Sequence, residues 1–355
     1  SGLFQFRKEL IEKLCTTNNV LVSVPSGSFI HKLEELGCKV TTIEFNRRGK
    51  NPFADILLIR EYVKLIRNTK ADIVLTYTIK PNVYGGIACQ ITKTPYIANI
   101  TGLGTTIENG GLMHYLATTL YRLGLRKAKC VFFQNINNME LLINKKIVRE
   151  KTRLIPGSGV NLSDYSLNKY PDEIEGIRFL FIGRVMKDKG IEELIKAMEM
   201  VHDRFPNTSL DIVGGYDDDY SKLIGEVVEK GFVNYHGQQP SVHSFIKNSH
   251  CTVLPSYHEG MANVLLESAS MGRPVIATRV PGCIETFDEG ITGFGCDSKS
   301  AESLVEAIIK FINLTYDEKK TMGLNGRVKM EKEFDRNIVV NAYLEEIATV
   351  ERLKT

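Results

Sequence analysis

The sequence predicts an α/β protein built from two doubly wound parallel-sheet domains. First, short β-branched runs alternate with amphipathic helical patterns along all 355 residues, as is typical of parallel sheets covered on both faces. Second, this length suits two domains better than one. Third, the alternation is interrupted between Pro156 and Gly176 by a stretch rich in Gly, Ser, Asn, Asp and Pro. Each half is therefore expected to be Rossmann-like, with ligands at the carboxyl ends of its strands.

The expected strands are short apolar runs. In the first half they are Val20–Val24, Val40–Ile43, Ile73–Tyr77, Tyr96–Ile100 and Val131–Phe133. In the second half they are Phe179–Ile182, Leu210–Val213, Val233–His236, Thr252–Leu254 and Val275–Thr278. Helical periodicity predicts helices at Phe6–Leu14, Ile56–Ile66, Leu112–Leu125, Asn263–Met271 and Ile338–Leu353.

These elements predict three segments. Residues 1–160 form a first domain, and residues 161–335 form a second domain. Residues 336–355 form a helix that packs back on the first domain. The chain opens on a helix where a doubly wound domain begins with a strand, so we expect a strand before Ser1.

Composition excludes several classes of protein. No apolar run approaches the roughly 18 residues of a membrane-spanning helix, and no signal-peptide pattern is seen. The seven cysteines are scattered and never form C-x-x-C, which favours a reducing compartment.

Residues 1–160 carry 23 Lys and Arg against 11 Asp and Glu, a net charge of +12, whereas residues 161–355 carry a net charge of −9. Such a split indicates that the first half faces an anionic surface, although charge can also drift without a function.

Two cations follow the first strand of the second half. The strand Phe179–Ile182 ends in Gly183-Arg184, and Lys189-Gly190 precede the next helix. Arg184 and Lys189 thus lie at the carboxyl end of a strand, beside a helix N-terminus, where a diphosphate is favoured. The alternative is a solvated charged loop.

A second pattern runs from Tyr257 to Glu267. Glu259 lies in the loop after a strand, where it can accept hydrogen bonds from sugar hydroxyls. Glu267 lies in a largely apolar helix, where a carboxylate is costly unless it is paired, and a ribose diol would pair it. Alternatively, Glu259 is a turn residue and Glu267 an exposed helix carboxylate. Pro281-Gly282 and Gly290 to Gly293 form a third pattern, which allows either close backbone approach or plain turns.

Together these patterns resemble the retaining glycosyltransferases of family four, which have the GT-B fold of two domains facing across a cleft. The resemblance covers the chain from Ser1 to about Leu353 and implies that Arg184 and Lys189 clamp a diphosphate. Glu259 would contact the transferred sugar and complete the catalytic set, and Glu267 would hold the ribose. The other implied donor-binding residues are Gly183, Gly214, Gly237, Gln238, Gly260, Met261, Ala262, Asn263 and Val264.

Two strings in the first half narrow the resemblance. Thr76 to Asn82 and Asn99 to Gly104 each end a strand. They are similar to strings of bacterial transferases that extend undecaprenyl-diphosphate-linked sugars, including α-1,3-N-acetylgalactosaminyltransferases. Many relatives have a histidine where this chain has Thr101 to Gly104, so no histidine contact to the donor is carried over. The resemblance makes residues 1–160 the domain that faces the acceptor and the membrane, and residues 161–335 the nucleotide-sugar-binding domain. The acceptor-side candidates are Gly2, Lys80, Asn82, Thr101 and Gly102. Lys80 could contact the diphosphate of the acceptor, and the alternative is a solvated loop lysine.

The resemblance also implies the partners. The donor is a UDP-sugar and the acceptor a sugar linked to undecaprenyl diphosphate. No metal or other cofactor and no nucleic acid is expected, and Asp217–Asp219 is interpreted as a solvated acidic turn. The protein is expected in the cytoplasm, peripheral on the inner face of a bacterial membrane.

A basic helical stripe is expected from Arg122, Arg126 and Lys129, opposite core residues Leu116, Leu120 and Leu123. A second basic cluster comprises Arg47, Arg48 and Lys50.

Two rival functions stay open. A sugar-nucleotide epimerase shares this architecture, but it needs acid and base groups around the sugar and no membrane surface. A catalytically silent partner subunit would have no reason to keep Arg184, Lys189, Glu259 and Glu267 together. A nicotinamide dehydrogenase is not expected, because no G-x-G-x-x-G follows a first strand.

Overall fold

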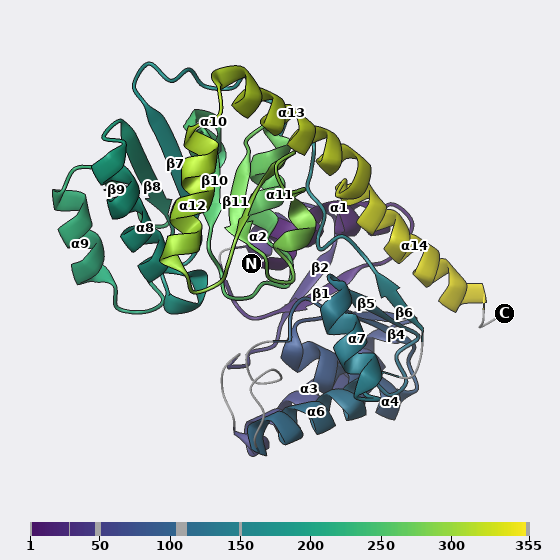
Figure 1. The fold of residues 1–355 in the computed structure, drawn as a ribbon. Coiled ribbons are helices and arrows are strands. Elements are labelled where there is room, and N and C mark those ends of the chain that lie inside the picture. The colour runs from purple at the N-terminus through teal and green to yellow at the C-terminus, as the bar shows by residue number, and fades with distance from the viewer. Residues whose placement is uncertain (1, 28, 47–50, 104–111, 149–150, 353–355) are drawn as a thin grey trace. The chain divides into compact units, whose positions relative to one another are not determined.

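The computed structural model describes residues 2–27, 29–46, 51–103, 112–148 and 151–352, and the chain forms two compact units (Figure 1). Unit 1 comprises Ser1–Ser158 and Arg336–Thr355, and unit 2 comprises Gly159–Asp335. The expected cluster of Arg47, Arg48 and Lys50, and Gly104, lie outside the described residues. Among the described helices, none is both long enough and apolar enough to cross a bilayer.

Unit 2 contains a six-stranded parallel sheet in the order β12-β11-β10-β7-β8-β9. Its strands are β7 (Ile177–Ile182), β8 (Thr208–Val213), β9 (Val233–Tyr235), β10 (Cys251–Leu254), β11 (Val275–Thr278) and β12 (Gly293–Cys296). Its helices are α8 (Ile191–Arg204), α9 (Ser221–Glu229), α10 (His243–Asn248), α11 (Asn263–Ser270), α12 (Ala301–Ile312) and α13 (Tyr316–Glu333), with short 3₁₀ turns at Lys187–Lys189 and Ile284–Thr286.

Helices cover both faces of this sheet, with α8, α9 and α12 on one and α10, α11 and α13 on the other (Figure 1). Alternate strand residues serve the two faces: Phe179 and Phe181 join the main core, whereas Leu180 packs with Val213 and Met271 on the opposite face. This period of two is what a sheet buried on both sides requires.

Unit 1 contains two parallel sheets, β1-β2 and β3-β4-β5-β6. The strands are β1 (Leu21–Val24), β2 (Lys39–Thr42), β3 (Val74–Tyr77), β4 (Tyr96–Ile100), β5 (Cys130–Phe133) and β6 (Thr152–Leu154). The helices are α1 (Gly2–Cys15), α2 (Ile30–Glu34), α3 (Pro52–Thr69), α4 (Gly86–Thr92), α6 (Leu112–Leu125), α7 (Ile136–Asn144) and α14 (Arg336–Arg352), and Pro81–Gly85 forms a π-helical turn before α4.

The last helix, α14, belongs to the core of unit 1. Val339 and Tyr343 pack with Phe132 of β5 and Leu10 of α1. The Tyr343 hydroxyl accepts a hydrogen bond of 2.6 Å from the side-chain amide of Asn99, which is fully buried at the carboxyl end of β4. A segment distant in sequence thus completes one face of the four-stranded sheet.

The expectation for α6 is wrong in two respects. Leu116 and Leu123 are not core residues, because 49% and 47% of their surfaces are exposed. Among the positions of this helix whose burial is described, the buried ones are instead Thr118, Tyr121, Gly124 and Leu125. The helix also ends at Leu125, so the predicted basic residues after it do not continue its stripe.

Candidate donor-binding site

The strand order of unit 2 reverses at β7, which lies between β10 and β8. In open parallel sheets, ligands bind at the carboxyl ends of the strands beside such a switch point. The loops that follow β7, β8 and β10 therefore define the candidate site, and they contain all three residues predicted to be catalytic.

Lys189 and Glu259 form an ion pair across the switch point, between the loops after β7 and β10. Their side chains are only 20% and 14% exposed. The Ser256 hydroxyl also donates to Glu259, at 2.8 Å, and the Tyr257 N–H donates to the Asp188 carbonyl at 2.9 Å. The sequence did not single out Ser256, which fixes the Glu259 carboxylate.

Arg184 forms the second ion pair of the site. Its Nη1 lies 2.5 Å from Oδ2 of Asp217, in the loop after β8. Asp217–Asp219 are exposed, as expected of a solvated acidic turn, and Asp217 in addition pairs with Arg184. The Asp217 side chain is 25% exposed, whereas the Arg184 side chain is 57% exposed.

Two glycines allow these loops to meet. Gly214 has φ +152°, and a Cβ there would lie 1.8 Å from the Gly183 carbonyl oxygen. Gly282 has φ +84°, and its Cβ would lie 2.5 Å from the Glu259 carbonyl oxygen. The Gly282 carbonyl also accepts the Ala262 N–H at 2.7 Å. The Pro281-Gly282 turn thus supports the Glu259 loop. Gly293 has a different role, in the pairing of β12 with β11. A Cβ at Gly293 would lie 2.2 Å from the Val275 carbonyl oxygen, so only glycine lets the two strands approach this closely.

Helix α11 begins at Asn263, directly after this loop. The preceding residue is Ala262, which makes no side-chain cap, so the helix N-terminus keeps its partial positive charge for a ligand. Among the described residues, the buried Oδ1 of Asn263 has no hydrogen-bond partner. Glu267 lies four residues on, on the same face of the helix as Asn263, and is only 8% exposed. Met261 is buried and Val264 half-buried.

The loop after β9 begins at Gly237 and contains Gly237 and Gln238, two of the implied donor-binding residues. The Gly214 N–H donates to the Gly237 carbonyl at 2.8 Å, and the Tyr235 hydroxyl donates to the Gly214 carbonyl at 3.0 Å. This loop is therefore attached to the glycines at the end of β8. Gln238 is exposed beside them.

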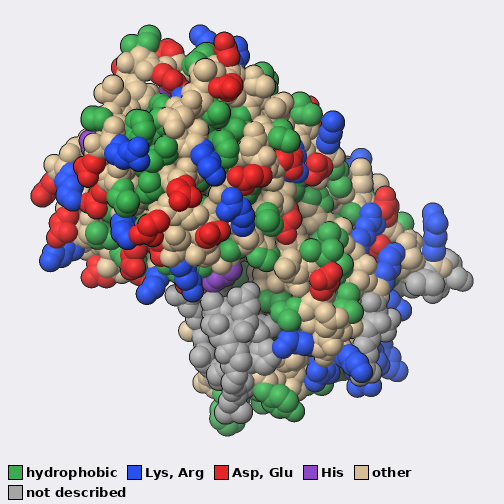
Figure 2. Space-filling view, viewed as in Figure 1, with side chains coloured by type: hydrophobic (Ala, Val, Ile, Leu, Met, Phe, Trp, Pro, Cys, Tyr) green, Lys and Arg blue, Asp and Glu red, His purple; other side chains and the backbone are tan. Residues whose placement is uncertain are grey.

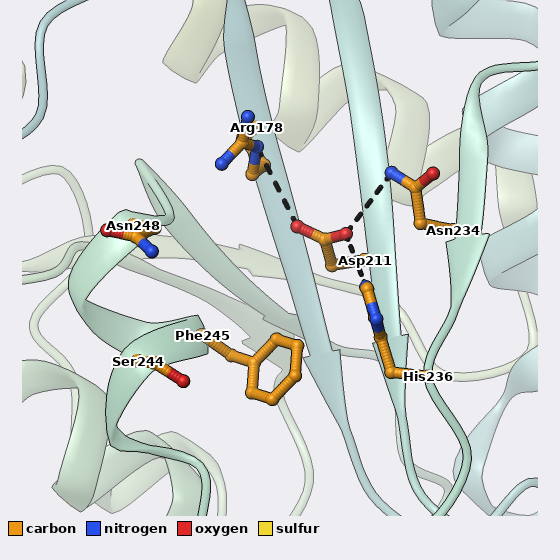
Figure 3. Close-up of a pocket in the computed structure, with 7 residues that line it drawn as sticks. All are labelled: Arg178, Asp211, Asn234, His236, Ser244, Phe245 and Asn248. Atoms are coloured by element: carbon orange, nitrogen blue, oxygen red, sulfur yellow. Dashed lines mark hydrogen bonds and ion pairs between the residues drawn. The ribbon is translucent and has the colours of Figure 1, made fainter.

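A separate pocket of about 280 Å³ lies between β7, β8, β9 and α10 (Figure 3). Asp211 forms its floor and accepts hydrogen bonds from Asn234 at 3.2 Å and from His236 at 2.8 Å. Arg178 lies 3.7 Å from the other carboxylate oxygen, and Phe245 forms a wall. The pocket contains none of the predicted donor residues, and its polar network holds His236 directly before Gly237.

The thiol directly after Gly282 is not acidic. Burial raises the pKa of the Cys283 thiol well above its usual value, so this sulfur stays protonated. Burial and the Glu193 carboxylate, which accepts the Tyr257 hydroxyl at 2.8 Å, likewise raise the pKa of Tyr257. Within the described part of the chain, we find no group of three or more His, Cys, Asp or Glu arranged to hold a metal ion.

The acceptor-side candidates lie in unit 1. Lys80 pairs with Asp55 at 2.6 Å and is 12% exposed, and the Tyr84 hydroxyl donates to the same carboxylate. These contacts account for Lys80 without an acceptor, and it is not a solvated loop lysine. Asn82 is 1% exposed and donates to the Asn99 carbonyl at 2.7 Å, so it too is tied into the fold.

The remaining candidates are more accessible. Gly2 is exposed at the start of α1, and Thr101 and Gly102 are half-buried directly after β4. Gly102 has φ +151°. No described contact assigns them to a substrate, so their acceptor role stays a prediction.

The two doubly wound units of this chain match glycosyltransferases of the GT-B fold. Residues 168–329 match the family model of glycosyl transferases group 1, and residues 6–135 match that of glycosyl transferase 4-like proteins. Both units of the chain thus match glycosyltransferase families, and the protein is an enzyme of this class.

Individual relatives agree with this assignment. The chain is 27% identical to the N,N'-diacetylbacillosaminyl-diphospho-undecaprenol alpha-1,3-N-acetylgalactosaminyltransferase of Campylobacter jejuni, over 97% of this chain and 95% of the relative. It is 26% identical to the capsular polysaccharide biosynthesis glycosyltransferase CapM of Staphylococcus aureus, over 81% and 79%. The crystal structure of Anabaena HepE in complex with UDP and glucose is similar with a TM-score of 0.78 and 20% identity, over 97% and 95%.

Proposed function

We propose that this enzyme is a retaining transferase that moves a hexose or N-acetylhexosamine from a UDP-sugar to a sugar on a lipid diphosphate. The observation that carries the proposal is that Arg184, Lys189 and the start of α11 all follow the carboxyl ends of β7 or β10, the strands beside the switch point of unit 2. These groups place positive charge where a diphosphate would leave. The UDP complex of the HepE structure supports a uridine donor.

In this reaction the bond between the anomeric carbon and the diphosphate oxygen breaks, and an acceptor hydroxyl bonds to the same face of that carbon. Arg184, Lys189 and the α11 N-terminus stabilise the departing UDP, and a phosphate oxygen takes the acceptor proton. Glu259 accepts hydrogen bonds from the transferred sugar and Glu267 from the ribose. The orphaned Oδ1 of Asn263 is a further acceptor for a ligand hydroxyl. Catalysis is then mainly positioning and electrostatic stabilisation.

The acceptor assignment is supported by the name of the Campylobacter jejuni relative, which acts on a sugar linked to undecaprenyl diphosphate. Such an acceptor is held in a membrane, so we also propose that unit 1 binds peripherally to the cytoplasmic face. Exposed Lys and Arg side chains predominate on the visible face of unit 1, whereas both signs of charge mix over unit 2 (Figure 2).

One stripe of α3 suits this surface. Phe53, Ile56 and Leu57 are 79%, 56% and 58% exposed and follow each other at helical spacing. The exposed Arg60, Lys64 and Arg67 continue the same stripe. An apolar end followed by basic residues is typical of helices that bind anionic interfaces. Tyr115 and Leu116 of α6 are also exposed.

A donor and acceptor screen tests the function. The enzyme is incubated with a panel of nucleotide sugars and short lipid-diphosphate sugars, and product masses and anomeric configuration are measured. We expect one added hexose or N-acetylhexosamine, retained configuration and release of UDP only when acceptor is present. UDP release without acceptor, or conversion of the donor to an epimer, would favour the epimerase. No turnover with any pair would favour the silent subunit.

A further inference from the structure

The two cations of the candidate site each have a carboxylate of their own. Lys189 is paired with Glu259, and Arg184 with Asp217. The clamp therefore has no net charge before a donor arrives, although a diphosphate carries several negative charges. Glu259 is accounted for by its contact with the transferred sugar, but the proposed reaction gives no role to Asp217.

Backbone contacts place Asp217 beside Arg184. The Val185 N–H donates to the Gly215 carbonyl at 2.9 Å, and the Asp217 N–H donates to the Val185 carbonyl at 3.1 Å. The loop after β8 is thus joined to the loop after β7 directly beyond Arg184. The same backbone pairing includes a parallel bridge between Val185 and Tyr216. The contact of Arg184 with Asp217 is thus supported by paired backbone and does not depend on the two side chains alone.

The other two acidic residues have different partners. The Asp218 carboxylate accepts the Lys187 N–H at 3.0 Å, and the Asp219 carboxylate accepts the Ser221 hydroxyl at 2.8 Å. Among the described contacts of the three acidic residues, only those of Asp217 include Arg184. Asp219 therefore provides a control with the same charge on the same loop.

The Arg184–Asp217 pair is suited to exchange. Over half of the Arg184 side chain is exposed, and ion pairs at exposed positions contribute little to stability. Within the described part of the chain, Asp217 is the only residue whose side chain pairs with the Arg184 guanidinium. A diphosphate offers more oxygens and more charge than a carboxylate, and bidentate contacts with phosphate are strong.

We propose that Asp217 is an exchangeable counter-ion that releases Arg184 to the donor diphosphate and recaptures it as the nucleoside diphosphate leaves. It is a positioning residue that lowers the affinity of the site for the product and speeds product release. This inference rests on the proposed diphosphate site.

Calorimetric titration of the full chain with UDP tests the inference. Asp217→Asn should bind UDP roughly two- to fivefold more tightly than wild type, the range for an exposed ion pair. Its UDP dissociation rate in stopped flow should fall by a similar factor. Asp217→Ala should also bind UDP more tightly than wild type, whereas Asp219→Asn should bind UDP as wild type does. In an Arg184→Ala background, Asp217→Asn should no longer tighten binding.

The outcomes separate the two proposals. Unchanged UDP affinity in Arg184→Ala would refute the diphosphate site itself. Weaker binding in Arg184→Ala, with unchanged or weaker binding in both Asp217 variants, would keep that site and overturn the counter-ion role. If Asp219→Asn also bound UDP more tightly, the effect would come from the overall charge of the loop, and the counter-ion role of Asp217 would be overturned.

Discussion

The ammonium group of Lys189 and the carboxylate of Glu259 form an ion pair although 70 residues separate them in sequence. The pair joins the ends of two adjacent strands at the point where the sheet order reverses. Because Lys189 follows β7 and Glu259 follows β10, the contact places the cation proposed for the leaving group beside the acceptor proposed for the sugar.

Lys189→Ala should reduce the transfer rate strongly, because it removes charge that we propose stabilises the departing UDP. The loss of one such group typically costs roughly 100- to 1000-fold in rate. Initial rates at saturating donor measure the effect. Lys187→Ala removes the same charge from an exposed neighbour and should stay close to wild type. Near-normal rates in a folded Lys189→Ala enzyme would remove Lys189 from the clamp.

Glu267→Gln should weaken UDP binding more than acceptor binding, since the proposed partner of Glu267 is the ribose. Titration with UDP and with acceptor, each alone, separates the two affinities. The control is Glu306→Gln, an exposed change on α12, a helix of the opposite face. Equal UDP affinity in Glu267→Gln and wild type would leave Glu267 a structural residue of α11.

Chelation should leave the transfer rate essentially unchanged, because we propose that Arg184, Lys189 and the α11 N-terminus provide the positive charge that a metal gives other transferases. The measurement is the initial rate before and after dialysis against EDTA. Loss of activity that magnesium or manganese restores would contradict metal independence.

Gly282→Ala should lower both stability and activity. Its positive φ costs of order 1–3 kcal/mol for a side chain, and the new Cβ would displace the Glu259 backbone. Gly290→Ala is the matched control: it has φ +72°, but a Cβ there meets no atom within 4 Å. Thermal unfolding should show both variants destabilised, and only Gly282→Ala should lose most of its activity. Equal activities would show that this turn does not support the site.

Liposome sedimentation tests the membrane surface. Binding to anionic vesicles should weaken at high salt, because each basic residue near such a surface contributes about 1 kcal/mol and salt screens it. Arg60→Glu with Lys64→Glu should weaken binding at low salt, and Phe53→Ser with Leu57→Ser should weaken it at any salt. The control is Lys222→Glu, on α9 of unit 2, with Lys230→Glu, directly after that helix. Wild type that ignores anionic vesicles would contradict this surface.

Strands with apolar runs could be predicted from sequence, and those without could not. Each of the ten expected strands overlaps an observed one, but β6 and β12 were not expected. Residues Thr152–Leu154 of β6 are half-exposed or exposed at a sheet edge, so no apolar run marks them. The sequence of β12, Gly-Phe-Gly-Cys, has low strand propensity and pairs through the space that Gly293 leaves open.

The candidate site was predictable one loop at a time. Arg184, Lys189 and Glu259 each follow a strand, and that position alone brings them to one edge of a parallel sheet. Their partners were not predictable, because the contact of Asp217 with Arg184 depends on which strands are neighbours. Leu116 and Leu123 show the same limit, since a helical stripe of leucines does not tell which side of α6 meets the sheet.

The path of the chain bears on how this enzyme can be modified. Unit 2 is one continuous insertion between Ser158 and Arg336 of unit 1. Its two ends lie side by side, because the Val160 N–H donates to the Phe334 carbonyl at 2.8 Å and Val160 bridges Asp335. The whole of unit 2 can therefore be exchanged for that of a related transferase at two adjacent junctions, with α14 left in place on unit 1. Such chimeras would separate the choice of donor from the choice of acceptor.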